Sequence, residues 1–244
     1  METQPIITIK NLRKSFGKND ILKGINLTLN KGENLVILGR SGNGKSVTIK
    51  CIVGLIKADE GTIEISGKNV TQLEYDELND VRVKIGFMFQ NGALYDSMSI
   101  RQNLKFTLKH HTRDLSEEAI ETEIIKALDS VGLKESIDKM PAELSGGMQK
   151  RIALARALII KPEIILYDEP TSGLDTITAR EISELILDVQ KKYKTSSIVI
   201  THDMACAKIT ANRILVLKEG TIVAEGTYDE LEKSEDPWVR SFFN

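Results

Sequence analysis

The residues best suited to chemistry lie in one short glycine-rich stretch, Gly39 to Ser46. Its letters, GRSGNGKS, fit the pattern G-x-x-x-x-G-K-[ST] at every fixed position. In such a stretch the backbone N–H groups turn inward around a phosphate chain, the lysine reaches the β- and γ-phosphates, and the last hydroxyl ligates Mg²⁺. The sequence therefore predicts a phosphate site whose contacts are Gly39, Arg40, Ser41, Gly42, Asn43, Gly44, Lys45, Ser46 and Val47.

The segments on either side of this loop are the elements that must position it. Residues 35–38 form an apolar run typical of a buried strand, and residues 47–53 can continue as a helix. Strand, glycine-rich loop and helix, in that order, are the context that the pattern requires. A plain glycine-rich turn with an exposed lysine is the alternative, and the two flanking elements disfavour it.

A second candidate group is a pair of acids, Asp168 and Glu169, which follow the apolar run 164–167. In phosphate-loop enzymes an aspartate at such a strand end holds Mg²⁺. An adjacent glutamate is placed to orient and deprotonate a water molecule. Two acids in a solvated loop are the alternative, and the phosphate loop upstream favours the catalytic interpretation.

The stretch 144–151 opens a predicted helix with a serine and two glycines. Ser145 can cap that helix. Gly146 and Gly147 leave bare N–H groups at the positive end of the helix, which suits another phosphate. The same three residues also make an ordinary turn and cap, and the local sequence leaves both interpretations open.

Composition limits the class of protein. The 244 residues carry 33 Lys and Arg against 35 Asp and Glu, a net charge of −2, which argues against a nucleic-acid partner. Cys51 and Cys206 lie outside any metal-binding spacing, so buried reduced thiols are expected. The adjacent pair His110 and His111 does not share a helix face, which disfavours a metal site. No run approaches the ~18 apolar residues of a membrane span, so any membrane role is expected to depend on a partner.

Strand and helix patterns alternate along the chain. Residues 99–140 are helical in character, with Ile120, Ile124, Leu128 and Val131 on one face. The pattern predicts an α/β core with a helical insert. The predicted strands cover residues 6–9, 25–29, 62–70, 85–89, 164–167, 197–200, 213–217 and 221–224, the last two as a hairpin.

Taken together, these motifs resemble the ATPase subunit of an ATP-binding-cassette (ABC) transporter over nearly the whole chain. Residues 144–149 resemble the family signature, with Met148 where glutamine is more common. The other matching positions are Gln90, the loop 172–175 that ends at Asp175, His202, and Phe16, where an aromatic residue often stacks on adenine. The resemblance implies a mainly parallel P-loop NTPase core, an N-terminal antiparallel β subdomain and an α-helical insert subdomain. The implied single domain, 1–244, divides into a core (about 1–90 and 160–230), a helical subdomain (91–159) and a tail (231–244).

The resemblance also implies a mechanism that one chain cannot complete. Two copies would pair head to tail around two ATP molecules, with Ser145 and Gly147 of one copy facing Lys45 and Ser46 of the other. Four residues would be catalytic, with Glu169 as the base: Glu169, His202, Lys45 and Gln90. Mg²⁺ would be held by Ser46, Gln90 and Asp168, and Asp175 would monitor the opposite site.

A narrower resemblance concerns the segment 90–100, QNGALYDSMSI. It is similar to the ATPase subunits of Mce/Mla-type phospholipid transporters. This implies an integral membrane permease and periplasmic lipid-binding components as partners, and a location on the cytoplasmic face of the inner membrane. The alternatives are an ABC ATPase for amino acids or metal complexes, a soluble non-transport relative, and a scaffold with an inactive site. The aromatic tail, 236–243, is expected to pack on its own domain, with a second subunit as the alternative.

Overall fold

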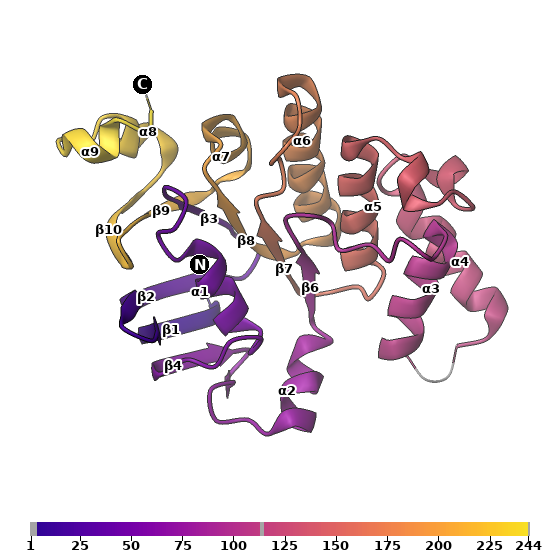
Figure 1. The fold of residues 1–244 in the computed structure, drawn as a ribbon, viewed down its shortest axis with the longest axis horizontal. Helices are drawn as coiled ribbons and strands as arrows, with labels where there is room; N and C mark the ends of the chain where they lie inside the picture. Colours follow the sequence, from indigo (N-terminus) through magenta and orange to yellow (C-terminus); the bar gives the residue numbers. More distant parts are fainter. Residues whose placement is uncertain (1–3, 113–114, 244) are drawn as a thin grey trace.

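A computed structural model describes residues 4–112 and 115–243 (Figure 1). Its strands are β1 Pro5–Phe16, β2 Asn19–Asn30, β3 Asn34–Leu38, β4 Glu60–Ile65, β5 Lys68–Asn69, β6 Ile85–Met88, β7 Ile164–Asp168, β8 Ser196–Thr201, β9 Arg213–Lys218 and β10 Thr221–Gly226. Its α-helices are α1 Lys45–Ile52, α2 Tyr75–Arg82, α3 Ile100–His111, α4 Glu117–Asp129, α5 Gly146–Leu158, α6 Thr176–Tyr193, α7 Met204–Thr210, α8 Tyr228–Glu232 and α9 Pro237–Arg240. No helix in the described ranges is both long and apolar enough to cross a bilayer.

The central sheet positions the candidate site. Its order is β10-β9-β3-β8-β7-β6, with parallel pairing from β9 to β6 and an antiparallel β9–β10 hairpin. All residues of β3, β7 and β8 are buried. Neighbours along a strand face opposite sides of the sheet, so Val36 and Leu38 join one core cluster and Leu35 and Ile37 join the other. The predicted α/β class with a parallel core is confirmed.

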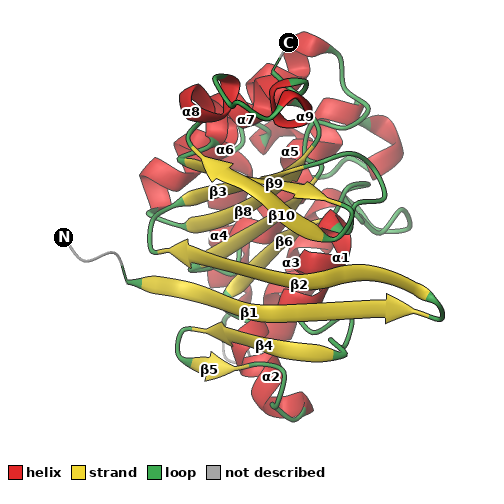
Figure 2. Cartoon of the chain, turned by 90° about the vertical axis from the view of Figure 1, so that its left-hand side faces the viewer, coloured by secondary structure: helices red, strands yellow, loops and turns green. Residues whose placement is uncertain are grey.

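The N-terminal sheet is antiparallel, in the order β2-β1-β4-β5 (Figure 2). The predicted strands 6–9 and 25–29 are too short, because β1 and β2 each extend over 12 residues. The β1–β2 register shifts between Ile9 and Leu12, and Asn11 has a φ of 49°. This bulge interrupts the alternation of apolar and polar residues on which the sequence prediction relied.

Helices α3, α4 and α5 form the helical part beside the core (Figure 1). Ser99 begins α3 with a capping box to Gln102. Ile120, Ile124 and Leu128 of α4 are buried together, so the predicted helix face is correct. His110 and His111 both belong to the last turn of α3, at its C-terminal end.

The C-terminal tail packs on its own domain, as expected. Val239 of α9 is fully buried, and Trp238 and Phe242 pack against the same core cluster with their ring centroids 4.9 Å apart. Both cysteines are buried and unpaired with each other, and burial raises the pKa of each thiol to about 11.

Candidate nucleotide-binding site

The glycine-rich loop joins the end of β3 to the start of α1, as predicted. Gly42 and Gly44 have φ values of 84° and 98°, which glycine adopts without strain. A side chain on Gly39 would lie 2.5 Å from the carbonyl oxygen of Leu217. The Nδ2 atom of Asn43 donates a hydrogen bond of 2.9 Å to the same oxygen. The loop is therefore fixed against strand β9.

Lys45 is the buried cation of the loop. Its Nζ atom donates to the carbonyl oxygens of Gly39, at 2.7 Å, and Arg40, at 3.3 Å. The same atom lies 3.4 Å from the Oε1 atom of Glu169. The residue is only 5% exposed, so this positive charge acts at short range with little screening by water.

The loop also reaches the first of the two acids. The Ser46 hydroxyl donates a 2.8 Å hydrogen bond to Oδ1 of Asp168, at the end of β7. Burial raises the pKa of Asp168 above its ordinary value, and the hydrogen bond from Ser46 opposes that rise. A hydroxyl, a carboxylate and the nearby Gln90 amide form the kind of oxygen set that Mg²⁺ prefers. These residues therefore fit a magnesium ion.

Glu169 is in contact with both Lys45 and His202. Its backbone has a φ of 50°, a left-handed conformation that is uncommon outside glycine. Its Oε2 atom lies 2.8 Å from Nδ1 of His202 and accepts a 3.3 Å hydrogen bond from the His202 backbone. Since Lys45 approaches the other oxygen, each carboxylate oxygen has a partner.

Lys45, Ser46, Glu169 and His202 line one cavity of about 430 Å³, within the usual size of a small-molecule site. Phe16, which is 49% exposed, forms part of its wall, and Nζ of Lys14 lies 5.3 Å from the centre of that ring. Ile21 is a lining residue that the sequence analysis missed. The other lining residues were all predicted: Ser41, Gly42, Gly44, Lys45, Ser46, Val47, Gln90, Glu169 and His202.

Seven predicted residues do not line this cavity: Gly39, Arg40 and Asn43 of the glycine-rich loop, Asp168 at the end of β7, and Ser145, Gly147 and Asp175 at two helix starts. The Ser145 hydroxyl accepts a hydrogen bond from Met148 N and caps α5. Asp175 caps α6, accepting from the backbone of Ile177 and from Thr178, whose hydrogen bonds lower the pKa of Asp175.

Gly147 is required where α5 and α6 approach. A side chain built on it would overlap the Cγ2 atom of Thr178. The two helix starts that carry Ser145 and Asp175 are therefore packed directly against each other.

One buried residue of this region was missed altogether. Lys150 of α5 is 7% exposed, and its Nζ atom donates to the backbone oxygens of Gln90 and Glu169. Its spacing from Gly147, Leu154 and Leu158 along the buried face of α5 is a signal of burial that the sequence does contain.

Comparison with known proteins shows the family. The pattern of the ABC transporter family matches residues 22–172, more than half of the chain. A probable ribonucleotide transport ATP-binding protein of Mycobacterium leprae is 38% identical over 98% of this chain, which spans 68% of that protein's length. The chloroplastic protein TRIGALACTOSYLDIACYLGLYCEROL 3 of Arabidopsis thaliana is 38% identical over 99% of this chain and 74% of its own length. A methionine import ATP-binding protein, MetN, of Brucella abortus is 38% identical over 91% of this chain and 60% of its own length.

A solved structure has the same fold. The ATP-binding cassette MJ0796, as a dimer in a post-hydrolysis state bound to ADP and Pi, superposes with a TM-score of 0.83 and 34% identity. The match covers 91% of this chain and 98% of MJ0796. This chain belongs to the ABC transporter family: it is an ATP-binding, ATP-hydrolysing P-loop cassette and an ABC transporter ATPase subunit.

Proposed function

We propose that this chain works as a head-to-tail homodimer that hydrolyses ATP at two composite sites and powers a phospholipid transporter. The single observation that carries the catalytic part is the convergence of Lys45 and His202 on the two oxygens of the Glu169 carboxylate. The three residues line the same cavity as the glycine-rich loop. A base, a phosphate-binding cation and an orienting imidazole therefore meet where a γ-phosphate would lie.

Hydrolysis then follows from the chain's own groups. The backbone N–H groups of the loop and Lys45 bind the phosphates, and Phe16 offers a ring for the adenine. Glu169 takes a proton from water as the water oxygen bonds to the γ-phosphorus. The bond between that phosphorus and the β–γ bridging oxygen breaks, which gives ADP and inorganic phosphate. Ser46, Asp168 and Gln90 would hold Mg²⁺, which supplies charge neutralisation for the phosphates.

The need for a second copy follows from the position of the remaining residues. Ser145 and Gly147 begin α5, whose positive N-terminal end suits an anion, yet neither lines the cavity of its own chain. A partner turned by a two-fold axis would bring its own α5 to that cavity, because such an interface uses the same surface twice. Dimeric MJ0796 supports this arrangement. Asp175, next to Gly147 at the start of α6, would then face the opposite site.

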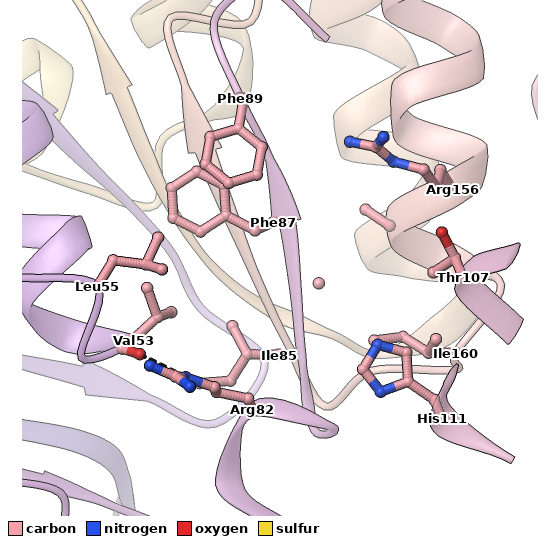
Figure 3. A pocket seen from close by; sticks show the side chains of 12 residues that line it. Val53, Leu55, Arg82, Ile85, Phe87, Phe89, Thr107, His111, Arg156 and Ile160 are labelled. Atoms are coloured by element: carbon pink, nitrogen blue, oxygen red, sulfur yellow. Dashed lines mark hydrogen bonds between the residues drawn. The ribbon is translucent and has the colours of Figure 1, made fainter. Parts of the chain in front are cut away.

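A permease partner fits a second pocket, of about 250 Å³, between the core and the helical subdomain (Figure 3). In this proposal the core is about 1–90 and 160–230, the helical subdomain 91–159 and the tail 231–244. Phe87 and Phe89 line the pocket, and the next residue, Gln90, lines the nucleotide cavity. The short segment 87–90 therefore connects the proposed permease pocket with the nucleotide cavity.

The lining of this pocket suits an apolar segment that carries an acid. Leu55 is 54% exposed at its edge. Arg82 and Arg156 line it and donate to backbone oxygens, and no carboxylate of the described residues pairs with either guanidinium. We therefore propose that the permease binds here, with this chain on the cytoplasmic face of the inner membrane.

Phospholipid is the proposed cargo because the segment 90–100 resembles that of Mce/Mla-type ATPases. In this chain Asn103 ties the segment to α3 by hydrogen bonds in both directions with the backbone of Tyr95. The name of the Arabidopsis relative includes that of a glycolipid, which supports a lipid as the cargo. The name of the MetN relative supports methionine import as the second candidate. Periplasmic lipid-binding components would complete the lipid system.

The catalytic proposal is tested with Glu169→Gln. This variant should bind ATP as tightly as wild type and release phosphate about 10²–10⁴-fold more slowly, since it lacks the base. Near-normal phosphate release would remove Glu169 from its role.

The transport proposal is tested by purification from native membranes in mild detergent, followed by identification of bound proteins and lipids. A permease with phospholipid supports it, and a permease with a methionine-binding protein supports the second candidate. Leu55→Asp should lose the permease and keep the ATPase activity of the isolated chain. Tyr75→Asp is the control, because Tyr75 is 72% exposed and lies outside the pocket.

A further inference from the structure

Lys150 lies at the junction of three segments that meet behind the nucleotide cavity. Its Nζ atom donates to the carbonyl oxygens of Gln90 and Glu169, the latter at 3.3 Å, and to the hydroxyl of Ser172, also at 3.3 Å. The three acceptors follow β6 or β7, or begin the loop that leads to α6. Lys150 itself belongs to α5.

Burial of an ammonium group costs free energy because the group loses its hydration, unless hydrogen bonds or opposite charges compensate for the loss. Burial lowers the pKa of Lys150, while the negative charges of Glu169 and Asp168 favour its protonated form. Within the described residues no carboxylate oxygen lies within 4.0 Å of its Nζ atom, so Lys150 has no direct ion-pair partner. A methionine of similar length would fill the same space without this cost, so packing alone does not explain a lysine here.

The contacts of Lys150 fix the two residues that must meet the attacking water. Strands β6 and β7 are parallel neighbours, with Met88 opposite Tyr167, and Gln90 and Glu169 each follow two residues later. Both side chains line the nucleotide cavity. A single ammonium group bound to both carbonyl oxygens therefore sets the distance between the two backbones from which these side chains extend.

We propose that Lys150 is a positioning residue for ATP hydrolysis, which holds the backbones of Gln90 and Glu169 in the arrangement that catalysis requires. Lys150 does not line the nucleotide cavity, so it acts through these two residues. It also lies on the same helix as Ser145 and Gly147. A shift of that helix toward a nucleotide held by the other copy is thereby passed to Glu169 of its own chain. The inference rests on the proposed function, because it requires Glu169 to act as the base.

The test compares Lys150→Met, Lys150→Arg and Lys161→Met in the full chain. Lys161 is the matched control, since it follows α5 and its side chain is 74% exposed in an ion pair with Glu123. Lys150→Met should lower kcat by roughly 10- to 100-fold, the scale of a small misplacement of catalytic groups, with ATP affinity within about threefold of wild type. Lys150→Arg should recover part of the rate, and Lys161→Met should match wild type. An unchanged kcat in Lys150→Met would overturn the proposal.

To distinguish a positioning role of Lys150 from a merely structural one, Lys150→Met is combined with Glu169→Gln in one chain. Residues that act through one another are not additive, so a positioning role predicts little further loss of single-turnover rate. If Lys150→Met lowers the single-turnover rate of Glu169→Gln by the same factor as it lowers that of wild type, the proposal is overturned. If Lys150→Met does not fold, Ser172→Ala removes one acceptor and should lower kcat in the same non-additive way; additivity there overturns the proposal too. Normal hydrolysis by Glu169→Gln alone would instead refute the proposed function.

Discussion

The Oε2 atom of Glu169 lies 2.8 Å from the Nδ1 atom of His202, although the carboxylate is buried and the imidazole is largely exposed. The contact joins the loop after β7 to the loop after β8, two parallel neighbours of the central sheet. The exposed imidazole therefore contacts one oxygen of the proposed base, and the buried Lys45 approaches the other.

His202→Ala should slow hydrolysis because the Glu169 carboxylate loses its imidazole partner. We expect kcat to fall roughly 100-fold, the cost of mispositioning a catalytic group, with little change in ATP affinity. Phosphate release and equilibrium ATP binding measure the two effects. His110→Ala is the control, since His110 is exposed and lies outside the cavity. Equal rates for both variants would contradict the role assigned to His202.

The composite site predicts complementation between two inactive copies. Lys45→Ala removes the phosphate-binding cation, and Ser145→Gly removes a hydroxyl while keeping a residue that caps helices almost as well. Each variant alone should be inactive. A mixed dimer restores one intact site, in which Lys45 comes from one copy and Ser145 from the other. Phosphate release from the mixture should therefore exceed that of either variant alone. A mixture as inactive as its parts would contradict the head-to-tail arrangement.

The contact between Gly147 and Thr178 predicts a compensating pair. Gly147→Ala should lower the free energy of unfolding by about 1–3 kcal/mol, because the new methyl group overlaps Cγ2 of Thr178. Thr178→Ser removes that Cγ2 atom and keeps the hydroxyl that donates to Asp175. The double variant should therefore regain most of the lost stability in urea unfolding. If Thr178→Ser gives no rescue, the overlap is not the cause.

The pKa of Asp168 predicts how stability changes with pH. Burial raises this pKa in the folded chain, so the stabilising contribution of the protonated form is complete below the ordinary carboxyl pKa and is lost as pH rises through the folded value. Asp168→Asn does not titrate. Its stability relative to wild type should therefore increase from acidic to neutral pH, while its activity is lost with the Mg²⁺ ligand. Asp188→Asn, at an exposed position of α6, should show no such trend. A flat difference for Asp168→Asn would contradict the assignment.

Packing of the tail predicts a stability effect at Val239. Val239→Ala should lower the free energy of unfolding by roughly 1–3 kcal/mol, because the side chain is fully buried in the main core cluster. Arg240→Ala, on the exposed side of α9, is the control and should behave as wild type. A normal monomer with weakened dimerisation would instead favour the second-subunit alternative.

The features that could be predicted from the sequence are those that depend on residues close together along the chain. The loop from Gly39 to Ser46 and the acids after β7 were identified because a strand, a turn and a helix leave local patterns. The helix of Ile120, Ile124 and Leu128 was found from its period for the same reason.

Contacts between residues far apart in the sequence leave no local pattern, so they were not predicted. Lys150 lies 60 residues from Gln90, and its burial among oxygens depends on how α5 packs on the sheet. The bulge at Asn11 depends on pairing of β1 with β2 and β4, so the length of β1 was underestimated. Ile21 reaches the cavity only because β2 passes beside the glycine-rich loop.

The left-handed backbone of Glu169 has a consequence for engineering. Glycine would adopt a φ of 50° without the cost of about 1–2 kcal/mol that a side chain carries there. Glu169→Gly would therefore relieve local strain and at the same time discard the carboxylate. The same exchange would leave the buried Lys45 ammonium without its carboxylate partner, and an unpaired buried charge costs more than the backbone strain that is relieved. The residue at position 169 is therefore dictated by its charged neighbour and by the reaction, against the preference of its own backbone.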